Sequence, residues 1–141
     1  MRDGVASKDY VNLELLNDQL KNLDLSINNI DNELEYAHLT INTINELKNN
    51  SSNEELVVPI GNGIFFSINK PKINDKIRIA IGAGVIVEKN FDEAIKFINK
   101  QIDQLNKQRE ESLNLYDRVS SQAIELQQKI ESKLRTKNKV Q

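Results

Sequence analysis

Apolar residues near the start of the chain recur alternately three and four positions apart. They are Leu13, Leu16, Leu20, Leu23, Ile27, Ile30, Leu34, Ala37, Ile41 and Ile44. So narrow an apolar stripe is typical of a coiled-coil seam, which needs a second helix to cover it. The same spacing returns later in the chain at Ile95, Ile98, Ile102, Leu105, Tyr116, Val119, Ala123, Leu126 and Ile130. The pattern therefore predicts two long helices that pair with each other.

Both ends of each helix carry sequence signals. The first helix is expected from about Ser7 or Asp9 to about Leu47, and the second from an N-cap at Asn90 to about Arg135. Two helices of about 40 to 45 residues would each be roughly 60 to 65 Å long. Because their lengths match, they can pair antiparallel, with facing residue numbers adding up to about 138 to 140. This pairing brings both chain ends to a common tip.

Between the helices the period shortens to that of β-strands. Four short runs rich in Val, Ile or Phe are expected to be strands: 56–60, 64–68, 76–81 and 85–88. The glycine-containing turns 61–63 and 82–84 predict two β-hairpins. The expected fold class is α+β, a long antiparallel coiled coil of two helices joined by two β-hairpins. The expected division is a helix in 1–50, a double hairpin in 51–90 and a helix in 91–141, all within one structural domain.

Two-stranded hairpins are marginally stable alone, and their free edges invite further pairing. We therefore expect an obligate oligomer. The side chains expected at its interface are Val57, Val58, Ile60, Ile64, Phe66, Ile68, Ile77, Ile79, Ile81, Val85 and Val87.

Two polar residues, Arg109 and Ser112, interrupt the second seam. One interpretation is a hinge that lets the helices flex. The favoured interpretation is an adjustment of register, with Leu113 and Leu115 replacing the missing apolar pair.

Charge divides along the chain. Residues 1–55 have a net charge of −7 and residues 91–141 a net charge of +2. Opposite charges beside two seams favour pairing of the two helices with each other.

Composition excludes several classes of protein. The chain has no cysteine, no signal-peptide pattern and no apolar run long enough to cross a bilayer, which predicts a cytoplasmic protein without a membrane partner. No catalytic or metal site is expected, because the single histidine, His38, has no suitable neighbours and the paired glycines form no phosphate-binding motif. We expect no cofactor. The basic tail from Lys129 to Lys139 lacks the interleaved aromatic residues that would favour nucleic acid.

One stretch is similar to a known family. The sequences Val57-Val58-Pro59-Ile60-Gly61-Asn62-Gly63 and Ile81-Gly82-Ala83-Gly84-Val85-Ile86-Val87-Glu88-Lys89, placed between two long helices, resemble the α-class subunit of archaeal-type prefoldin. This resemblance implies an ATP-independent chaperone of two α and four β subunits, whose hairpins form a β-barrel body. It also implies that the tips of the coiled coils capture non-native polypeptides and deliver them to a group II chaperonin.

The resemblance assigns capture of these polypeptides, the clients, to apolar side chains near the chain ends. They are Val5, Tyr10, Val11, Leu13, Leu15, Ile124, Leu126, Ile130 and Leu134. Leu13, Leu126 and Ile130 lie on the seam, where burial between the helices is the default role. Leu15, Ile124 and Val11 lie off the seam and are the better candidates for client contact. The alternative function is a structural prefoldin-like protein that forms homo-oligomers or filaments.

Overall fold

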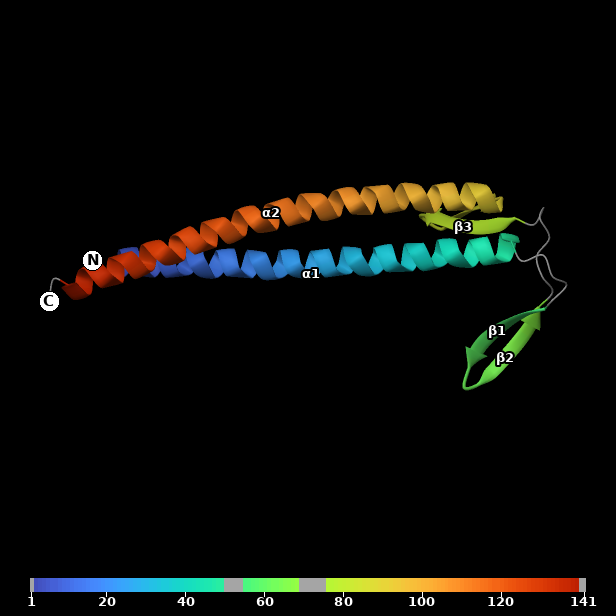
Figure 1. Ribbon diagram of the computed structural model, residues 1–141, viewed down its shortest axis with the longest axis horizontal. Coiled ribbons are helices and arrows are strands. Elements are labelled where there is room, and N and C mark those ends of the chain that lie inside the picture. The colour runs from blue at the N-terminus through green and yellow to red at the C-terminus, as the bar shows by residue number, and fades with distance from the viewer. Residues whose placement is uncertain (1, 50–54, 69–75, 140–141) are drawn as a thin grey trace. The chain divides into compact units, whose positions relative to one another are not determined.

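The computed structural model describes residues 2–49, 55–68 and 76–139 of the chain. Its elements follow in the order α1 (Arg2–Asn49), β1 (Leu56–Gly61), β2 (Ile64–Ile68), β3 (Ile77–Gly82), β4 (Val85–Lys89) and α2 (Phe91–Lys139) (Figure 1). The predicted fold class of two long helices and two antiparallel hairpins is confirmed. Each hairpin is a separate two-stranded sheet, so no barrel closes within a single chain.

The expected start of the first helix was wrong. α1 begins at Arg2 and continues through both Ser7 and Asp9. Asp9 lies inside this helix, and its carboxylate accepts a hydrogen bond from Lys133 Nζ of α2. No proline interrupts residues 2–8, and the single glycine there, Gly4, costs a helix only about 1 kcal/mol, so the sequence does not stop the helix at Ser7. The end of the second helix was also placed too early, since α2 continues past Arg135 to Lys139.

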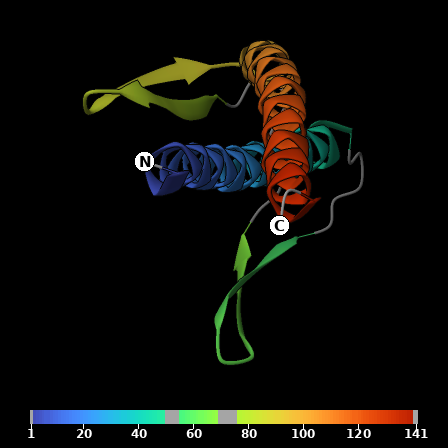
Figure 2. The same cartoon turned by 90° about the vertical axis from the view of Figure 1, so that its left-hand side faces the viewer.

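One compact unit consists of the first part of α1 and the last part of α2, residues 2–33 and 104–139. The first turns of α1 and the last turns of α2 lie at the same end of this unit (Figures 1 and 2). Seam residues form its interior, with Ile27 of α1 and Val119, Ala123 and Ile130 of α2 buried. The expected antiparallel pairing is confirmed.

The second compact unit covers residues 34–103 and has its own apolar cluster. Ile44, Phe91 and Ala94 are its buried centre, with Leu47, Ile77, Ile79, Ile95 and Ile98 packed around them. Since Ile77 and Ile79 belong to β3, the cluster attaches the β3–β4 hairpin to both helices. These two isoleucines therefore have partners within the chain, in addition to any role in assembly.

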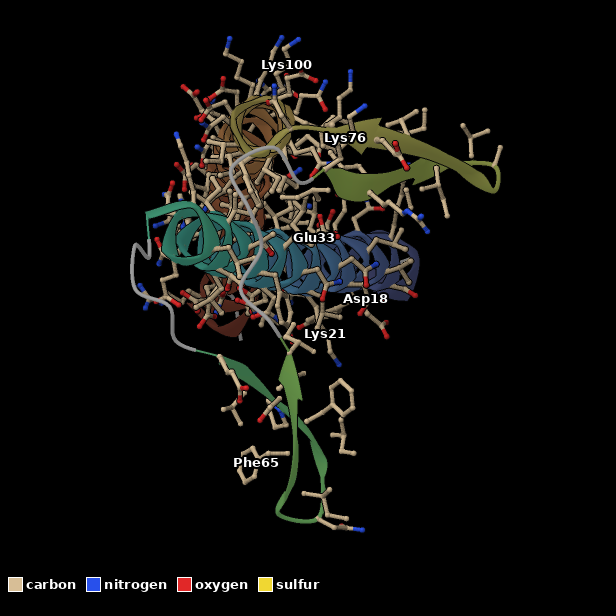
Figure 3. The ribbon with its side chains drawn as sticks, turned by 90° about the vertical axis from the view of Figure 1, so that its right-hand side faces the viewer. Asp18, Lys21, Glu33, Phe65, Lys76 and Lys100 are labelled. Carbon is tan, nitrogen blue, oxygen red and sulfur yellow. The ribbon has the colours of Figure 1, made fainter. Side chains whose placement is uncertain are left out.

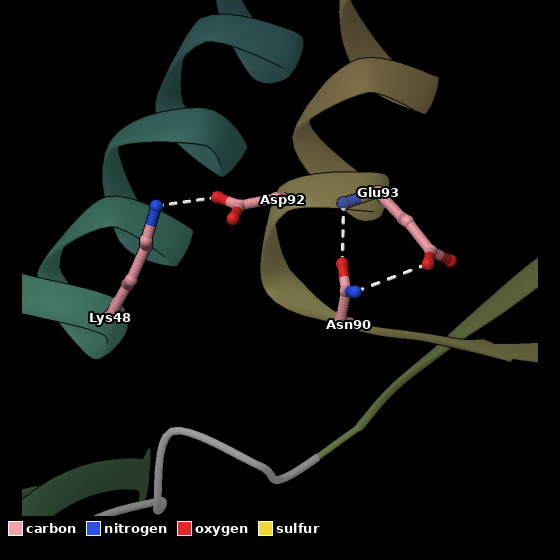
Figure 4. A network of polar contacts seen from close by, with 4 residues as sticks. All are labelled: Lys48, Asn90, Asp92 and Glu93. Carbon is pink, nitrogen blue, oxygen red and sulfur yellow. Dashed lines mark hydrogen bonds and ion pairs between the residues drawn. The ribbon is translucent and has the colours of Figure 1, made fainter.

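The start of α2 has the expected N-cap. The Glu93 backbone N–H donates a hydrogen bond of 2.8 Å to Asn90 Oδ1, and Asn90 Nδ2 donates one of 3.1 Å to Glu93 Oε1 (Figure 4). The first bond satisfies a helix N–H that has no partner within the helix, and the second joins the two side chains and holds Asn90 in place. Beside them, Lys48 of the last turn of α1 forms an ion pair with Asp92.

Ion pairs between the helices give the register of the seam. Residue numbers add up to 140 at Asp31–Arg109 and at Lys48–Asp92, inside the predicted range. They add up to 142 at Asp9–Lys133. Every predicted seam position is buried or half-buried, as a coiled-coil seam requires.

The two hairpins use the same turn. Asn62-Gly63 and Ala83-Gly84 each have two consecutive positive φ angles, of 52° and 74° in the first turn and 51° and 74° in the second. Such turns match the twist of paired strands. An irregularity in register precedes each turn, between Pro59 and Gly61 and between Ala80 and Gly82. Among the described residues, neither helix contains a stretch apolar and long enough to cross a membrane.

Candidate functional site

The described residues offer little for catalysis. No group of three or more His, Cys, Asp or Glu side chains among them is placed to hold a metal ion. Every buried side-chain nitrogen or oxygen in the described part of the chain has a hydrogen-bond partner. His38 is exposed on α1. Large exposed apolar side chains gather at one end of the helix pair and on the hairpins, and others, such as Leu25 and Tyr36, lie elsewhere on α1.

The tip is defined here as residues 7–16 of α1 and 123–136 of α2. It carries five exposed apolar side chains of the predicted client-capture set: Tyr10, Val11, Leu15, Ile124 and Leu134. Leu15 and Ile124 lie off the seam, as expected, and are 60% and 54% exposed. The helix pair does not use these side chains for its own packing, so they are free to contact another molecule.

The seam residues of the same set are covered. Ile130 is buried, and Leu13 and Leu126 are half-buried between the two helices. The side chain of Val5 lies outside the described residues. The structure therefore divides the predicted set into side chains already open to a partner and side chains that the helix pair covers.

A charge pair closes the seam at the tip. Lys133 Nζ lies 3.0 Å from Asp9 Oδ2, and Asp9 is the only buried charged residue in the described part of the chain. Sequence reasoning missed this pair because it followed only apolar residues. The signal was present: Asp9 lies four residues before Leu13, and Lys133 lies three residues after Ile130, so both continue the seam spacing.

A second charge pair lies inside the seam. The guanidinium Nε of Arg109 donates a hydrogen bond of 2.6 Å to Asp31 Oδ1, and both side chains are partly exposed. α2 continues unbroken through this position. Of the two leucines expected to replace the missing apolar pair, Leu113 is half-buried, whereas Leu115 is exposed. Arg109 thus stays at the seam and pairs across it, and the expected substitution by Leu115 was wrong.

The hairpins form the second apolar surface. Most of the predicted interface set is exposed in the single chain, namely Val57, Val58, Ile60, Ile64, Phe66, Ile68, Ile81 and Val85. Val87 is half-buried. Sequence reasoning missed Phe65 and Ile86, which are exposed as well. Figure 3 shows Phe65 projecting from its hairpin. So much exposed apolar surface on two small sheets indicates that other chains cover it.

Comparison with known proteins agrees with this arrangement. The model of the prefoldin subunit family matches residues 16–136, which is most of the chain. The chain belongs to the prefoldin family. This family is a chaperone family, so the exposed apolar surfaces belong to a prefoldin-type chaperone.

The relatives are named as one kind of prefoldin subunit. Prefoldin subunit alpha of Thermofilum pendens is 30% identical over 98 residues, which cover 70% of this chain and 73% of that protein. Prefoldin subunit alpha 1 of Methanocaldococcus jannaschii is 26% identical over 130 residues, which cover 92% of this chain and 87% of that protein. The resemblance to α-class subunits is therefore confirmed.

A solved structure shows the same fold. It is the cryo-EM structure of filamentous prefoldin from Methanocaldococcus jannaschii, with a TM-score of 0.58 and 21% sequence identity. The match covers 87% of this chain and 95% of that chain. Prefoldin subunits work as oligomers, which accounts for the apolar hairpin surfaces of the single chain.

Proposed function

We propose that the chain is a subunit of a prefoldin hetero-oligomer that holds non-native polypeptides without using ATP and transfers them to a group II chaperonin. The exposed apolar side chains at the tip are the main support for this proposal. Leu15 and Ile124 have no role in the seam, yet they are large and apolar. Removing apolar surface from water is favourable by roughly 25 cal/mol per Å² and requires no particular sequence in the client.

Weak contact at each tip becomes strong when several tips act together. A client bound by one tip meets the next at a high effective concentration, so overall affinity rises without a deep pocket. We propose that residues 51–90 form the assembly region and that two chains of this α class combine with four β-class subunits. The exposed faces of both hairpins support this arrangement, because a partner subunit would cover them.

The proposed mechanism is holding rather than catalysis. The tip acts through apolar contact alone, so the protein needs no cofactor, no metal and no bound nucleotide. Any ATP dependence in a refolding assay would then belong to the chaperonin that receives the client. We place this activity in the cytoplasm, with unfolded chains as clients and neither membrane nor nucleic acid as partner.

A pair of substitutions tests the tip directly. The double variant Leu15→Ser/Ile124→Ser removes two exposed apolar side chains and leaves the seam intact. Combined with a β-class partner, it should assemble as the wild type does and lose most of its ability to suppress aggregation of a denatured protein, measured by light scattering.

The chain provides a matched control. Leu25 also lies on α1 off the seam and is 55% exposed, close to the 60% of Leu15, but it lies outside the tip. Leu25→Ser should therefore leave suppression unchanged. Full suppression by the Leu15→Ser/Ile124→Ser variant would contradict the assignment, and an equal loss with Leu25→Ser would show that the tip has no special role.

The alternative proposal is a structural protein that forms homo-oligomers or filaments. The similar fold of a filamentous prefoldin is the observation that favours it. Mixing with a β-class subunit separates the two proposals. A discrete hetero-oligomer that suppresses aggregation supports the first, and a polydisperse homopolymer indifferent to the β subunit supports the second.

A further inference from the structure

The charge pair at the tip differs from the other ion pairs of the helices. The side chain of Asp9 is only 12% exposed, whereas Asp31 and Asp92, the acidic partners of the other two pairs, are 44% and 66% exposed. Asp9 and Lys133 also occupy positions that continue the seam, where two apolar residues would pack best. Among the side chains that the structure describes, the outermost layer of the seam at the tip is therefore an ion pair.

An ion pair closes a helix pair differently from an apolar layer. When two apolar side chains separate, both become exposed to water, and this opposes opening. When Asp9 and Lys133 separate, the buried carboxylate of Asp9 regains its hydration, which offsets the lost attraction, whereas the side chain of Lys133 is already 46% exposed in the closed pair. If Lys133 is absent, however, the Asp9 carboxylate stays buried without its partner in the closed state. The pair thus closes the tip while making its opening easier than a leucine layer would.

The residues next to this pair are the covered members of the client-capture set. Ile130 is buried, and Leu13 and Leu126 are half-buried just inside Asp9–Lys133. The exposed members, such as Leu15 and Ile124, are accessible with the pair closed. Separation of the two helix ends would add three large apolar side chains to the same surface.

We propose that the Asp9–Lys133 ion pair is a clasp that keeps the tip closed between clients, and that its opening adds Leu13, Leu126 and Ile130 to the client-binding surface. This inference rests on the proposed function, because it regulates capture at the same tip. The occupant of the opened surface is an apolar segment of a non-native polypeptide. The contact is autoinhibitory, since it covers apolar surface that a client would otherwise reach.

The first test alters the charge of the clasp. In Asp9→Lys, two like charges face each other, so backbone amides of residues 9–16 and 126–133 should exchange hydrogen roughly five- to thirtyfold faster than in the wild type. The swapped variant Asp9→Lys/Lys133→Asp restores opposite charges and should return exchange toward the wild-type rate. Glu14→Lys, which makes the same charge change at an exposed position off the seam, is the matched control and should leave exchange unchanged.

The second test holds the two helix ends together with a covalent crosslink. Because the chain has no cysteine, a short bismaleimide would join only the two thiols of Asp9→Cys/Lys133→Cys, assembled with a cysteine-free β-class partner. The crosslinked complex should hold several-fold less denatured client than the same variant capped with N-ethylmaleimide. The leucine pair Asp9→Leu/Lys133→Leu also favours the closed tip. It should slow hydrogen exchange at the tip and reduce the amount of client held, as the crosslink does.

The outcomes separate this inference from the function on which it rests. Equal client holding by the crosslinked and capped forms would overturn the clasp, as would unchanged exchange in Asp9→Lys. In either case capture by the wild type, and its loss in Leu15→Ser/Ile124→Ser, would still support the proposed function. If that double variant captures client fully, the proposed function fails, whatever the clasp does.

Discussion

At the scale of single residues, the two hairpin turns offer a comparison within one chain. Asn62 and Ala83 occupy the same turn position with nearly the same positive φ angle, 52° and 51°. In this left-handed conformation the Cβ of either residue meets the following carbonyl oxygen at a cost of roughly 1 kcal/mol, and asparagine offsets part of this cost by local hydrogen bonding of its side chain, which alanine cannot do. The second turn is therefore the less stable of the two.

Ala83→Asn should stabilise the β3–β4 hairpin by up to about 1 kcal/mol, because it gives the turn the Asn-Gly sequence preferred there. The expected result is a higher melting temperature of the assembled protein in differential scanning calorimetry. Asn62→Ala makes the reverse change in the other turn and should lower the melting temperature. A decrease with Ala83→Asn would contradict this reasoning.

Local sequence patterns predicted the start of one helix but not of the other. The cap at Asn90 was predictable because its partner Glu93 lies three residues away and both hydrogen bonds are local. Asp9 was expected close to the start of the first helix, yet it lies within α1 and contacts Lys133. The contact spans 124 positions of sequence, and only the seam spacing, which Asp9 and Lys133 both continue, pointed to it.

At the scale of elements, the helix pair depends on a seam that polar residues interrupt in the middle of α2, at Arg109 and Ser112. Arg109 lies at a seam position and pairs with Asp31, and both side chains are more than a third exposed. Pairs so exposed contribute about 0 to 1 kcal/mol to stability. Their more important effect is on register, since a shift of one heptad would bring Asp31 opposite other residues and leave Arg109 unpaired.

Arg109→Leu should raise the free energy of unfolding by about 1 kcal/mol, because burying a leucine in the seam stabilises by more than a partly exposed ion pair. Thermal unfolding of the assembled protein checks this. Leu115 is exposed, so Leu115→Arg serves as a control that should have little effect. A melting temperature lowered by Arg109→Leu would show that the ion pair contributes more than its exposure indicates.

The elements themselves were largely predictable. A seam of period 3.5 and strands bounded by glycine turns are repeated signals, and each strand was placed to within one residue at either end. The interhelical ion pairs were not predicted, since the antiparallel register came from helix lengths alone. Asp31–Arg109 and Lys48–Asp92 fell within the expected register, while Asp9–Lys133 differed by two positions.

At the scale of the whole molecule, the two hairpins have different surfaces. In β1–β2, Val58 pairs with Phe66 on one face and Pro59 with Phe65 on the other, so both faces are apolar. In β3–β4, one face carries the ion pair Arg78–Glu88. Since alternate residues point to opposite faces of a sheet, β1–β2 requires cover on both sides.

Phe65→Ser should therefore weaken assembly, because it removes a large apolar side chain that the single chain leaves 62% exposed. The expected result is dissociation of the hetero-oligomer at a higher protein concentration in sedimentation. Arg78→Ser, at an exposed polar position of the other hairpin, is the control and should leave that concentration nearly unchanged. If both variants dissociate at the same protein concentration, no subunit covers the face that carries Phe65.

The central proposal is that this chain acts as a client-holding subunit within a hetero-oligomer, and native mass spectrometry tests it most directly. The 16.1 kDa chain would be mixed with a β-class prefoldin subunit, with and without a chemically unfolded client. We predict one discrete species with the mass of two α and four β chains, which gains the mass of a client only when the client is unfolded. A homopolymer whose mass does not change when the β subunit or the client is added would contradict the proposal.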